Sequence, residues 1–504
     1  MLKTVFVAPD PGRLRLRNAA RAVLGVGLAV VLCGLTGHPL TAVISGGLAA
    51  LLALFTVTDA TVRAQAVSTA LLPVAGFPVL ALAAVLQDQP LARDLAFLAV
   101  AGVGVLARRW GPRGHTLGVF AFMTFFAAQF LRTVPADLPG LYSAVALALL
   151  ASSAVRFGLW CHERRVPPPA VPVLPGGRGL ARTTTRQAIQ VTAAGAFALV
   201  IGQSLSGERW YWAVGAAWWI FVNTTSRGET LVRGFRRVLG TLAGIGLSLL
   251  IAVPLHGAGA PTAVLVAVCV FAVFYTAAVS YTWMMLAVTL MVGLLYGLLG
   301  ELTPALLALR LAETGVGALG AVLAVLLLVP VTTHATTHAW IQQALRCVHR
   351  CTSEAAARLA GSADADPGPS VAELERLLGR VRLSLAPLVH PLSPLRARKA
   401  RARRVLALLD DCAREVRGLT AVAADPDASH DARLAAACRR VEAAVHALVP
   451  PPETGEGADT LSAPAARQHP GAEAAIAHLH ALERALADLA APLRTPPHAP
   501  LQPA

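Results

Sequence analysis

Apolar residues along this chain gather in long runs that short polar segments separate. A helix that crosses a bilayer needs about 20 mostly apolar residues, because each residue rises ~1.5 Å across a hydrocarbon core of ~30 Å. The pattern therefore predicts an all-α polytopic membrane protein. About twelve transmembrane helices are expected, at residues 22–37, 41–57, 68–86, 91–106, 116–131, 138–160, 188–205, 211–222, 238–255, 261–280, 281–300 and 305–330.

The basic residues between these runs predict the side of the membrane that each loop faces. Lys and Arg are frequent at the N-terminus and in every second loop, whereas the opposite loops hold only Arg93, Arg132 and Arg209. Cytoplasmic loops carry the excess of basic residues in membrane proteins. We therefore expect a multi-pass protein of the cytoplasmic (inner) membrane, embedded in the lipid bilayer, with both termini in the cytoplasm.

The membrane part divides into two stretches of six predicted helices. A Pro- and Gly-rich connector lies between them, and a basic residue opens each stretch, Arg21 in the first and Arg186 in the second. Two such stretches imply parallel repeats, an arrangement found in transporters, although any chain of twelve helices can be cut into two sixes. The predicted domains are a first repeat at 1–165, a cytosolic linker at 166–185, a second repeat at 186–330 and a cytosolic helical tail at 331–504.

Beyond residue 330 the apolar residues take the spacing of amphipathic helices. Leu374, Leu378, Val381 and Leu385 form one such series, and similar series follow at residues 406–419, 434–448 and 476–489. Disordered breaks are expected at residues 361–370 and 450–469. The basic run at residues 396–404 suits either contact with anionic lipid headgroups or a solvated helix face.

Composition and charge narrow the class of protein. Of the 504 residues, 56% are hydrophobic and 14% are charged, whereas a soluble chain carries about 25% charge. An ordinary cytosolic enzyme is therefore excluded. The net charge of +15 comes mainly from arginines that flank the apolar runs, so no nucleic-acid partner is expected.

The most specific stretch of sequence is residues 210–251, which read WYWAVGAAWWIFVNTTSRGETLVRGFRRVLGTLAGIGLSLLI. A Trp/Tyr cluster precedes a polar turn and spaced arginines, and the next helix opens with Arg237, Gly240, Thr241 and Gly244. With the later run Arg310-Leu-Ala-Glu313-Thr-Gly-Val-Gly, this resembles the fusaric acid resistance protein-like (FUSC) family of inner-membrane proteins, related to aromatic acid exporters. The resemblance covers residues 186–330 and implies efflux of organic anions, with aromatic carboxylic acids as the substrate class.

Arg310 and Glu313 are the strongest candidates for the substrate or proton pathway. A charge at the bilayer centre costs about 2.5 to 3.5 kcal/mol on insertion scales, so such residues tend to pair and to face a cavity. Three residues apart, the two share a helix face and can partly neutralise each other. The pattern leaves two interpretations open, a pair that locks helices together and a pair that handles an anion or a proton.

Four further residues are candidates for the same pathway. Arg233 and Arg237 lie at the inner surface, where arginine also serves orientation and headgroup contact. Phe122 and Phe126 share one face of a Phe-rich helix, and an aromatic wall suits a planar apolar substrate.

Small residues and aromatic residues near this region favour structural roles. Gly240, Thr241 and Gly244 form a packing motif, because small residues four apart let a neighbouring helix approach closely. Five aromatic residues lie at the two ends of the short run at 211–222, which favours an aromatic belt at the membrane surface over a stacking site. These residues are Trp210, Tyr211, Trp212, Trp218 and Trp219.

No motif supports catalysis, ATP hydrolysis or a cofactor. The sequence contains no Walker A loop, nucleophile elbow or HExxH motif, so we expect no enzyme and no cofactor. The seven scattered cysteines do not suggest a disulfide framework. His334 with His338, and Cys347 with Cys351, have i, i+4 spacing, but more than two helical turns separate the pairs, so no metal site is expected.

The sequence thus favours a secondary efflux transporter of organic anions, such as aromatic carboxylic acids, coupled to the proton gradient. Two alternatives stay open: a non-transporting membrane scaffold whose cytosolic tail docks a partner, and a passive anion channel. The expected partners are the bilayer and a small organic anion, and a homo-oligomer is also open.

Overall fold

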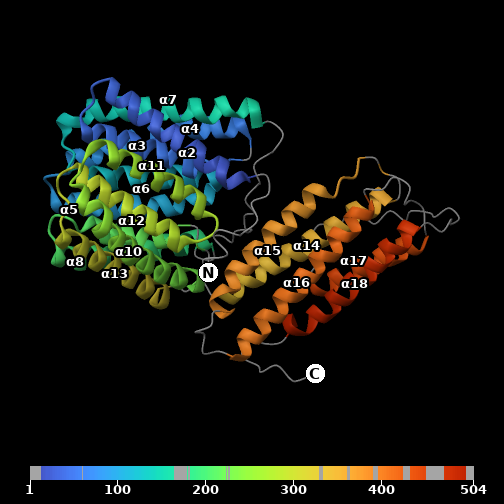
Figure 1. Cartoon of the computed structure of the whole chain (residues 1–504). Helices are drawn as coiled ribbons and strands as arrows, with labels where there is room; N and C mark the ends of the chain where they lie inside the picture. The colour runs from blue at the N-terminus through green and yellow to red at the C-terminus, as the bar shows by residue number, and fades with distance from the viewer. Residues whose placement is uncertain are drawn as a thin grey trace. The chain divides into compact units, whose positions relative to one another are not determined.

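The computed structural model describes residues 13–59, 61–163, 179, 182–222, 224, 227–328, 333–359, 362, 364–389, 396–423, 432–449 and 470–494. The regular secondary structure within these ranges is helical. The chain divides near Pro330 into two compact units, which Figure 1 shows in the blue-to-olive and the orange-to-red parts of the colour range. We call the described residues of 13–328 the membrane unit and those of 333–494 the tail unit.

Every apolar run that the sequence predicts to be a helix coincides with a helix of the membrane unit. The twelve α-helices of its described residues are α2 (Leu14–Leu35), α3 (Leu40–Thr56), α4 (Val62–Val85), α5 (Pro90–Leu106), α6 (Gly111–Phe130), α7 (Leu138–Glu163), α8 (Thr183–Leu205), α9 (Tyr211–Phe221), α10 (Arg227–Leu255), α11 (Gly259–Ala277), α12 (Tyr281–Leu298) and α13 (Pro304–Leu327). The prediction of an all-α chain with many apolar helices is confirmed.

The helices differ in their ability to cross a bilayer. In the described part of the chain, nine stretches are long and apolar enough to do so, and one of them joins α5 and α6 through the 3-10 turn Ala107–Trp110. α3 is a shorter apolar helix, and α9 has only 11 residues. The number of spans, their orientation and the division into repeats stay predictions.

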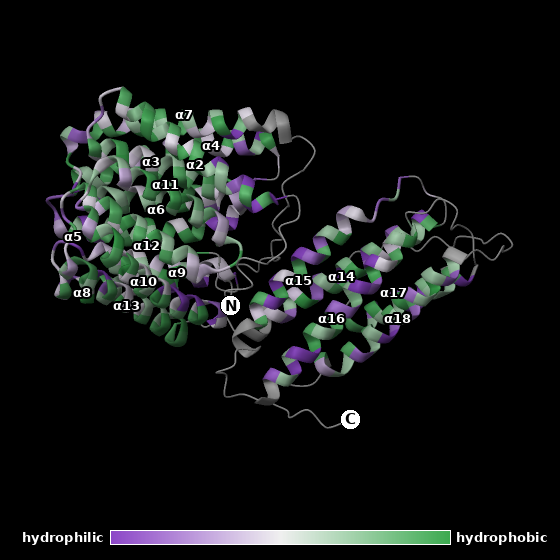
Figure 2. Cartoon of the chain, in the orientation of Figure 1, coloured by the Kyte–Doolittle hydropathy of each residue, from purple (hydrophilic) through white to green (hydrophobic). Residues whose placement is uncertain are grey.

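The surface of the membrane unit is apolar, as lipid contact requires. Of the exposed large apolar side chains in the described residues, all but Leu383 belong to the membrane unit. Figure 2 shows that hydrophobic residues make up most of the membrane unit, whereas the tail helices alternate between hydrophobic and hydrophilic residues. A soluble monomer rarely exposes such extended apolar surface, so the unit is a multi-pass membrane protein.

Helix pairings in the first half of the membrane unit have counterparts in the second half. α2 packs against α3 and α7, and α7 also against α3; likewise α8 packs against α9 and α13, and α13 also against α9. The pairs α4 with α6 and α5 with α6 correspond to α10 with α12 and α11 with α12. Between the halves, α5 packs against α8 and α11 against α2.

Two short helices of the membrane unit, α3 and α9, both end at an arginine from another helix or turn. Arg156 donates hydrogen bonds to the carbonyl oxygens of Ala53 and Val57 at the end of α3, at 2.8 and 2.9 Å. Arg108 donates one to the carbonyl oxygen of Phe221, the last residue of α9, at 3.0 Å. The last carbonyls of a helix lack partners within the helix and carry partial negative charge. A guanidinium at this position therefore stabilises the C-terminal end of α3 and that of α9.

The tail unit contains five helices that enclose a core of their own. They are α14 (Thr333–Leu359), α15 (Gly368–Val389), α16 (Arg396–Ala423), α17 (Ala432–Leu448) and α18 (Pro470–Arg494). The core residues include Val348, Val381, Val416, Val441 and Leu479, all at most 1% exposed. Four of the five helices match the predicted amphipathic series, and α14 is an addition to them. Of the predicted breaks, residues 450–469 lie outside the described residues, and α15 begins within the other at Gly368.

Candidate functional site

The membrane unit encloses a cavity of about 120 Å³ in which helices of both halves meet. Apolar side chains of α3 and α6 form one side of it, including Leu52, Phe55 and Phe126. Short helix α9 contributes Trp212, Gly215 and Trp219, and α12 contributes a series of Met, Val and Leu residues. A smaller cavity of about 40 Å³ lies beside it and shares Leu48, Leu52, Met123 and Ala127 with its wall.

Arg237 of α10 and Arg310 of α13 are the charged residues that line the larger cavity. Both are buried, at 6% and 5% exposure. Arg237 donates a hydrogen bond to the hydroxyl of Tyr281 at 3.2 Å, and its Nη1 also lies 3.5 Å from the sulfur of Met285. The described residues place no carboxylate in the cavity wall, so the wall is apolar with two positive charges.

The guanidinium of Arg310 lies over the indole of Trp212, 3.7 Å from the ring centroid. Such cation–π contacts contribute about 0.5 to 2 kcal/mol, depending on desolvation. Trp212 is held in turn, because its Nε1 donates a hydrogen bond to the hydroxyl of Tyr296 at 2.7 Å. In the described structure Nε and Nη1 of Arg310 are buried without a hydrogen-bond partner. Two N–H donors of Arg310 are therefore available to a ligand, next to the aromatic ring of Trp212.

Glu313 lies one helical turn beyond Arg310 but does not form an ion pair with it. Its side chain is 0% exposed, and neither carboxylate oxygen has a hydrogen-bond partner among the described residues. The sequence favours mutual neutralisation of the two charges, since residues three apart share a face. In the structure the guanidinium instead contacts Trp212, so the two charges lie near each other without direct contact.

The other predicted pathway residues take different positions. Phe126 lines the cavity and packs edge-on against Trp212, with 4.8 Å between the ring centroids. Phe122 is fully buried and stacks on Trp218 at 4.0 Å, outside the cavity wall. Arg233 lies over the ring of Tyr281 at 4.0 Å, next to the cavity residue Arg237. The structure thus places Arg237, Phe126 and Arg310 in the wall of the cavity. Phe122 and Arg233 do not line the cavity.

Three of the five aromatic residues in and next to α9 are buried rather than exposed at a membrane surface. Trp210, Tyr211 and Trp218 are at most 3% exposed, so the prediction of an aromatic belt is wrong for these three. The reason is that α9 packs against α8 and α13 and also contacts α6 and α10. Spacing alone does not show whether a short apolar helix lies at the edge or in the centre of a bundle.

The packing motif of α10 lies where this helix contacts α12. A Cβ added at Gly240 would lie 2.5 Å from the carbonyl oxygen of Thr282, and one at Gly244 would lie 2.6 Å from Cβ of Thr289. Thr241 lies between them and lines the cavity. The two glycines therefore permit the close approach that sets the wall of the cavity.

We expect Gly240→Ala to lower the thermal unfolding midpoint of the purified protein, because overpacking a tight contact costs about 1 to 3 kcal/mol. Gly246→Ala is the matched control, since a Cβ there meets nothing within 4 Å and alanine is the better helix former. Thermal unfolding of both variants in the same detergent measures the difference. Equal midpoints would show that the contact between α10 and α12 is looser than described.

Comparison with known proteins agrees with the resemblance seen in the sequence. Residues 187–324 match the model of the family described as fusaric acid resistance protein-like. The matched segment runs from α8 into α13 and contains Trp212, Arg237, Arg310 and Glu313. Searches of curated proteins and of solved structures found no match. This part of the chain is thus similar to that family, and the likeness fits a membrane transporter in general.

The sequence did not reveal the partners of Arg310 and Arg237. Tyr281 and Trp212 lie far from these arginines along the chain and meet them only through helix packing. One signal was available, since α3 and α9 are short apolar helices at the same position in the two halves. Short helices of this kind indicate the binding site in many transporters.

Proposed function

We propose that this chain is a secondary efflux transporter of organic anions, and that its substrates have an apolar body and an acidic group. The observation that carries the proposal is the cavity whose wall is apolar except for Thr241 and the two arginines Arg237 and Arg310. Buried guanidinium groups without a facing carboxylate favour an anion, and Arg suits a carboxylate because it can donate two parallel hydrogen bonds. Aromatic carboxylic acids are the class that combines both properties.

The size of the cavity supports a substrate of about one ring. A cavity of about 150 Å³ in another protein accepts benzene, and the space here is about 120 Å³. Phe126, Trp212 and Trp219 line it, so a planar ring would meet aromatic faces and edges. Offset and edge-on contacts between rings are worth about 0.5 to 1.5 kcal/mol beyond burial.

The corresponding helix pairings of the two halves support a duplicated transporter. α3 and α9 take equivalent places in the series of pairings, and both contribute to the cavity wall. In transporters built from repeats, the substrate site lies between the repeats. We infer that the two halves move relative to each other around this cavity, in a cytoplasmic membrane with both termini in the cytoplasm.

Glu313 supports coupling to the proton gradient. A carboxylate that is fully buried and lacks a hydrogen-bond partner is costly when ionised, which makes it a candidate to take up and release a proton. Substrate bound at Arg310 would change the charge one helical turn away. We infer that proton binding at Glu313 and anion binding at Arg310 are linked in this way.

The test is transport by the purified full chain in proteoliposomes. We expect saturable uptake of benzenesulfonate, which stays ionised and does not leak through the bilayer as a neutral acid, and accumulation above equilibrium when a pH gradient is imposed. Benzamide serves as the uncharged comparison, and liposomes without protein give the background rate. Uptake that only equilibrates, with no response to the gradient, would indicate a passive channel. No flux above background for benzenesulfonate or for aliphatic acids would favour the alternative of a membrane scaffold that does not transport.

A further inference from the structure

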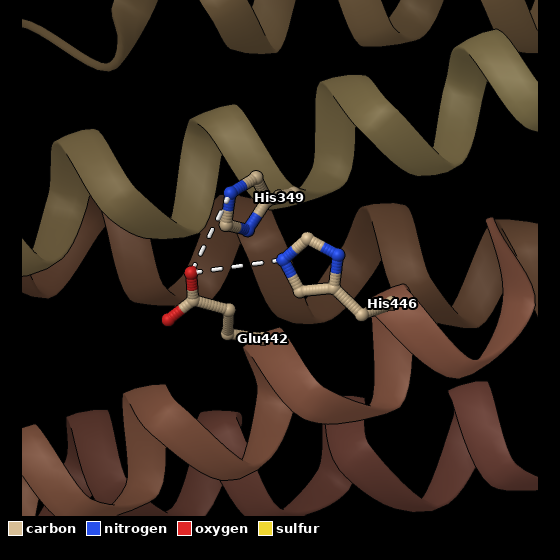
Figure 3. A group of neighbouring side chains, drawn as sticks. All are labelled: His349, Glu442 and His446. Carbon is tan, nitrogen blue, oxygen red and sulfur yellow. Dashed lines mark ion pairs between the residues drawn. The ribbon is translucent and has the colours of Figure 1, made fainter. Parts of the chain in front are cut away.

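Three potential metal ligands meet on the surface of the tail unit. His349 belongs to α14, whereas Glu442 and His446 lie one turn apart on α17 (Figure 3). A carboxylate oxygen of Glu442 lies 3.9 Å from Nε2 of His349 and 3.8 Å from Nε2 of His446. One ligand atom from each residue fits within 4.8 Å of the other two.

From this geometry we propose that His349, Glu442 and His446 bind a divalent transition-metal ion, with Zn²⁺ as the best fit. Two imidazoles and one carboxylate with an open fourth position form a known zinc ligand set. Ca²⁺ and Mg²⁺ prefer oxygen ligands throughout. The site is independent of the proposed transport function.

Two of the three separations between the ligand atoms are already close to the spacing that a zinc ion requires. In a tetrahedral site with bonds of about 2.0 to 2.1 Å, neighbouring ligand atoms lie roughly 3.3 Å apart. The observed separations of 3.8 and 3.9 Å exceed this by about half an ångström. The side chains are 36%, 49% and 51% exposed, so they have room to close on an ion and solvent can deliver it.

The core of the tail unit fixes the two helices that carry the ligands. α14 packs against α17, and Val348 and Val445, which adjoin two of the ligands in sequence, are at most 3% exposed. Arg350, the neighbour of His349, is engaged in an ion pair with Glu373 at 2.9 Å. A bound ion would therefore connect the first helix of the tail unit to its fourth without a change in the fold.

Sequence spacing could not reveal this site. Glu442 lies 93 residues after His349, and only Glu442 and His446 have the i, i+4 spacing that indicates a shared metal. The pairs that the sequence suggested do not form it. Cys347 and Cys351 are buried in the core, where Cys347 donates a hydrogen bond to the carbonyl oxygen of Ser370, and the side chain of His334 lies outside the described residues.

The experiment uses the full chain in detergent, free of any histidine tag and stripped of metal with a chelator. Titration with Co²⁺ should give one ion per chain with the visible absorption of a tetrahedral site, and Zn²⁺ but not Mg²⁺ should displace it. Zn²⁺ should also raise the thermal unfolding midpoint, because an ion that binds only the folded state stabilises it.

Matched variants separate this site from other histidines. His349→Gln and His446→Gln should each weaken Co²⁺ binding at least tenfold and abolish the zinc-dependent rise of the unfolding midpoint. His480→Gln is the control, because His480 is an exposed histidine of the same unit that contacts Arg440. His446→Cys should retain binding, with an added near-ultraviolet band from a thiolate ligand. Absence of cobalt binding in the wild type, or equal binding in all variants, would overturn the proposal.

Discussion

Arg310→Gln should reduce the initial rate of organic anion transport at limiting substrate by at least about 30-fold. The reason is that losing one partner of a buried charge pair costs about 2 kcal/mol or more, and each 1.4 kcal/mol is tenfold. Arg310 is the cavity residue with the most unused donors, and it is held against Trp212. Transport of an uncharged analogue should change far less, because only the Coulombic attraction is removed.

Two further variants make this result interpretable. Arg132→Gln is the matched control, since Arg132 forms an exposed ion pair with Glu208 and such pairs contribute about 0 to 1 kcal/mol. Arg310→Lys keeps the charge but loses the planar guanidinium, so it should retain part of the activity. Proteoliposome uptake and membrane abundance should be measured together. Wild-type uptake by Arg310→Gln would remove this residue from the substrate site.

Glu313→Gln should fold at least as well as the wild type and lose the stimulation of transport by a pH gradient. The structure gives Glu313 no hydrogen bond and no solvent contact, so a neutral isostere removes the cost of a buried charge at little loss of packing. Because glutamine cannot take up or release a proton, coupling should disappear while exchange of anions continues. The measurement is uptake with and without an imposed gradient.

Glu301→Gln provides the comparison for this second variant. Glu301 forms a partly exposed ion pair with Arg209 at 2.9 Å, and its loss should leave the response to the gradient intact. The double variant Arg310→Gln with Glu313→Gln tests the pairing interpretation. Restored abundance and activity in the double variant would show that the two charges stabilise each other rather than act on substrate and proton. A full response to the gradient in Glu313→Gln would exclude this residue as the proton carrier.

The hydropathy pattern predicted the helices of the membrane unit well, because lipid contact imposes long apolar runs on the sequence. The predicted boundary between the runs at 261–280 and 281–300 lies within three residues of the end of α11 at Ala277 and coincides with the start of α12 at Tyr281. The burial of Trp218 and the stacking of Phe122 on it were not predictable. Both depend on which face of a uniformly apolar helix meets a neighbouring helix. A helix without a polar face gives no sequence pattern that distinguishes its buried side from its lipid-facing side.

The candidate site was predictable only residue by residue. Charged residues within a membrane helix are costly, which made Arg310 and Arg237 candidates from the sequence. Phe126 was a candidate because it belongs to a Phe-rich helix face. The cavity itself arises from α3 and α6 of one half and α9 to α13 of the other. Arg310 also shows the limit of the i, i+3 rule, since a long side chain can reach a tryptophan on another helix instead of a carboxylate on its own.

The short length of α9 has a consequence for the thickness of the apolar barrier. Eleven residues extend about 16 Å, roughly half of a hydrocarbon core of ~30 Å. Charged groups adjoin both ends of the helix, since Arg209 and Glu301 pair just before it and Arg108 donates to its last carbonyl oxygen. On the proposed transport path, a solute that moved along α9 would cross an apolar layer only about half as thick as the hydrocarbon core, with Trp212 and Trp219 within that layer.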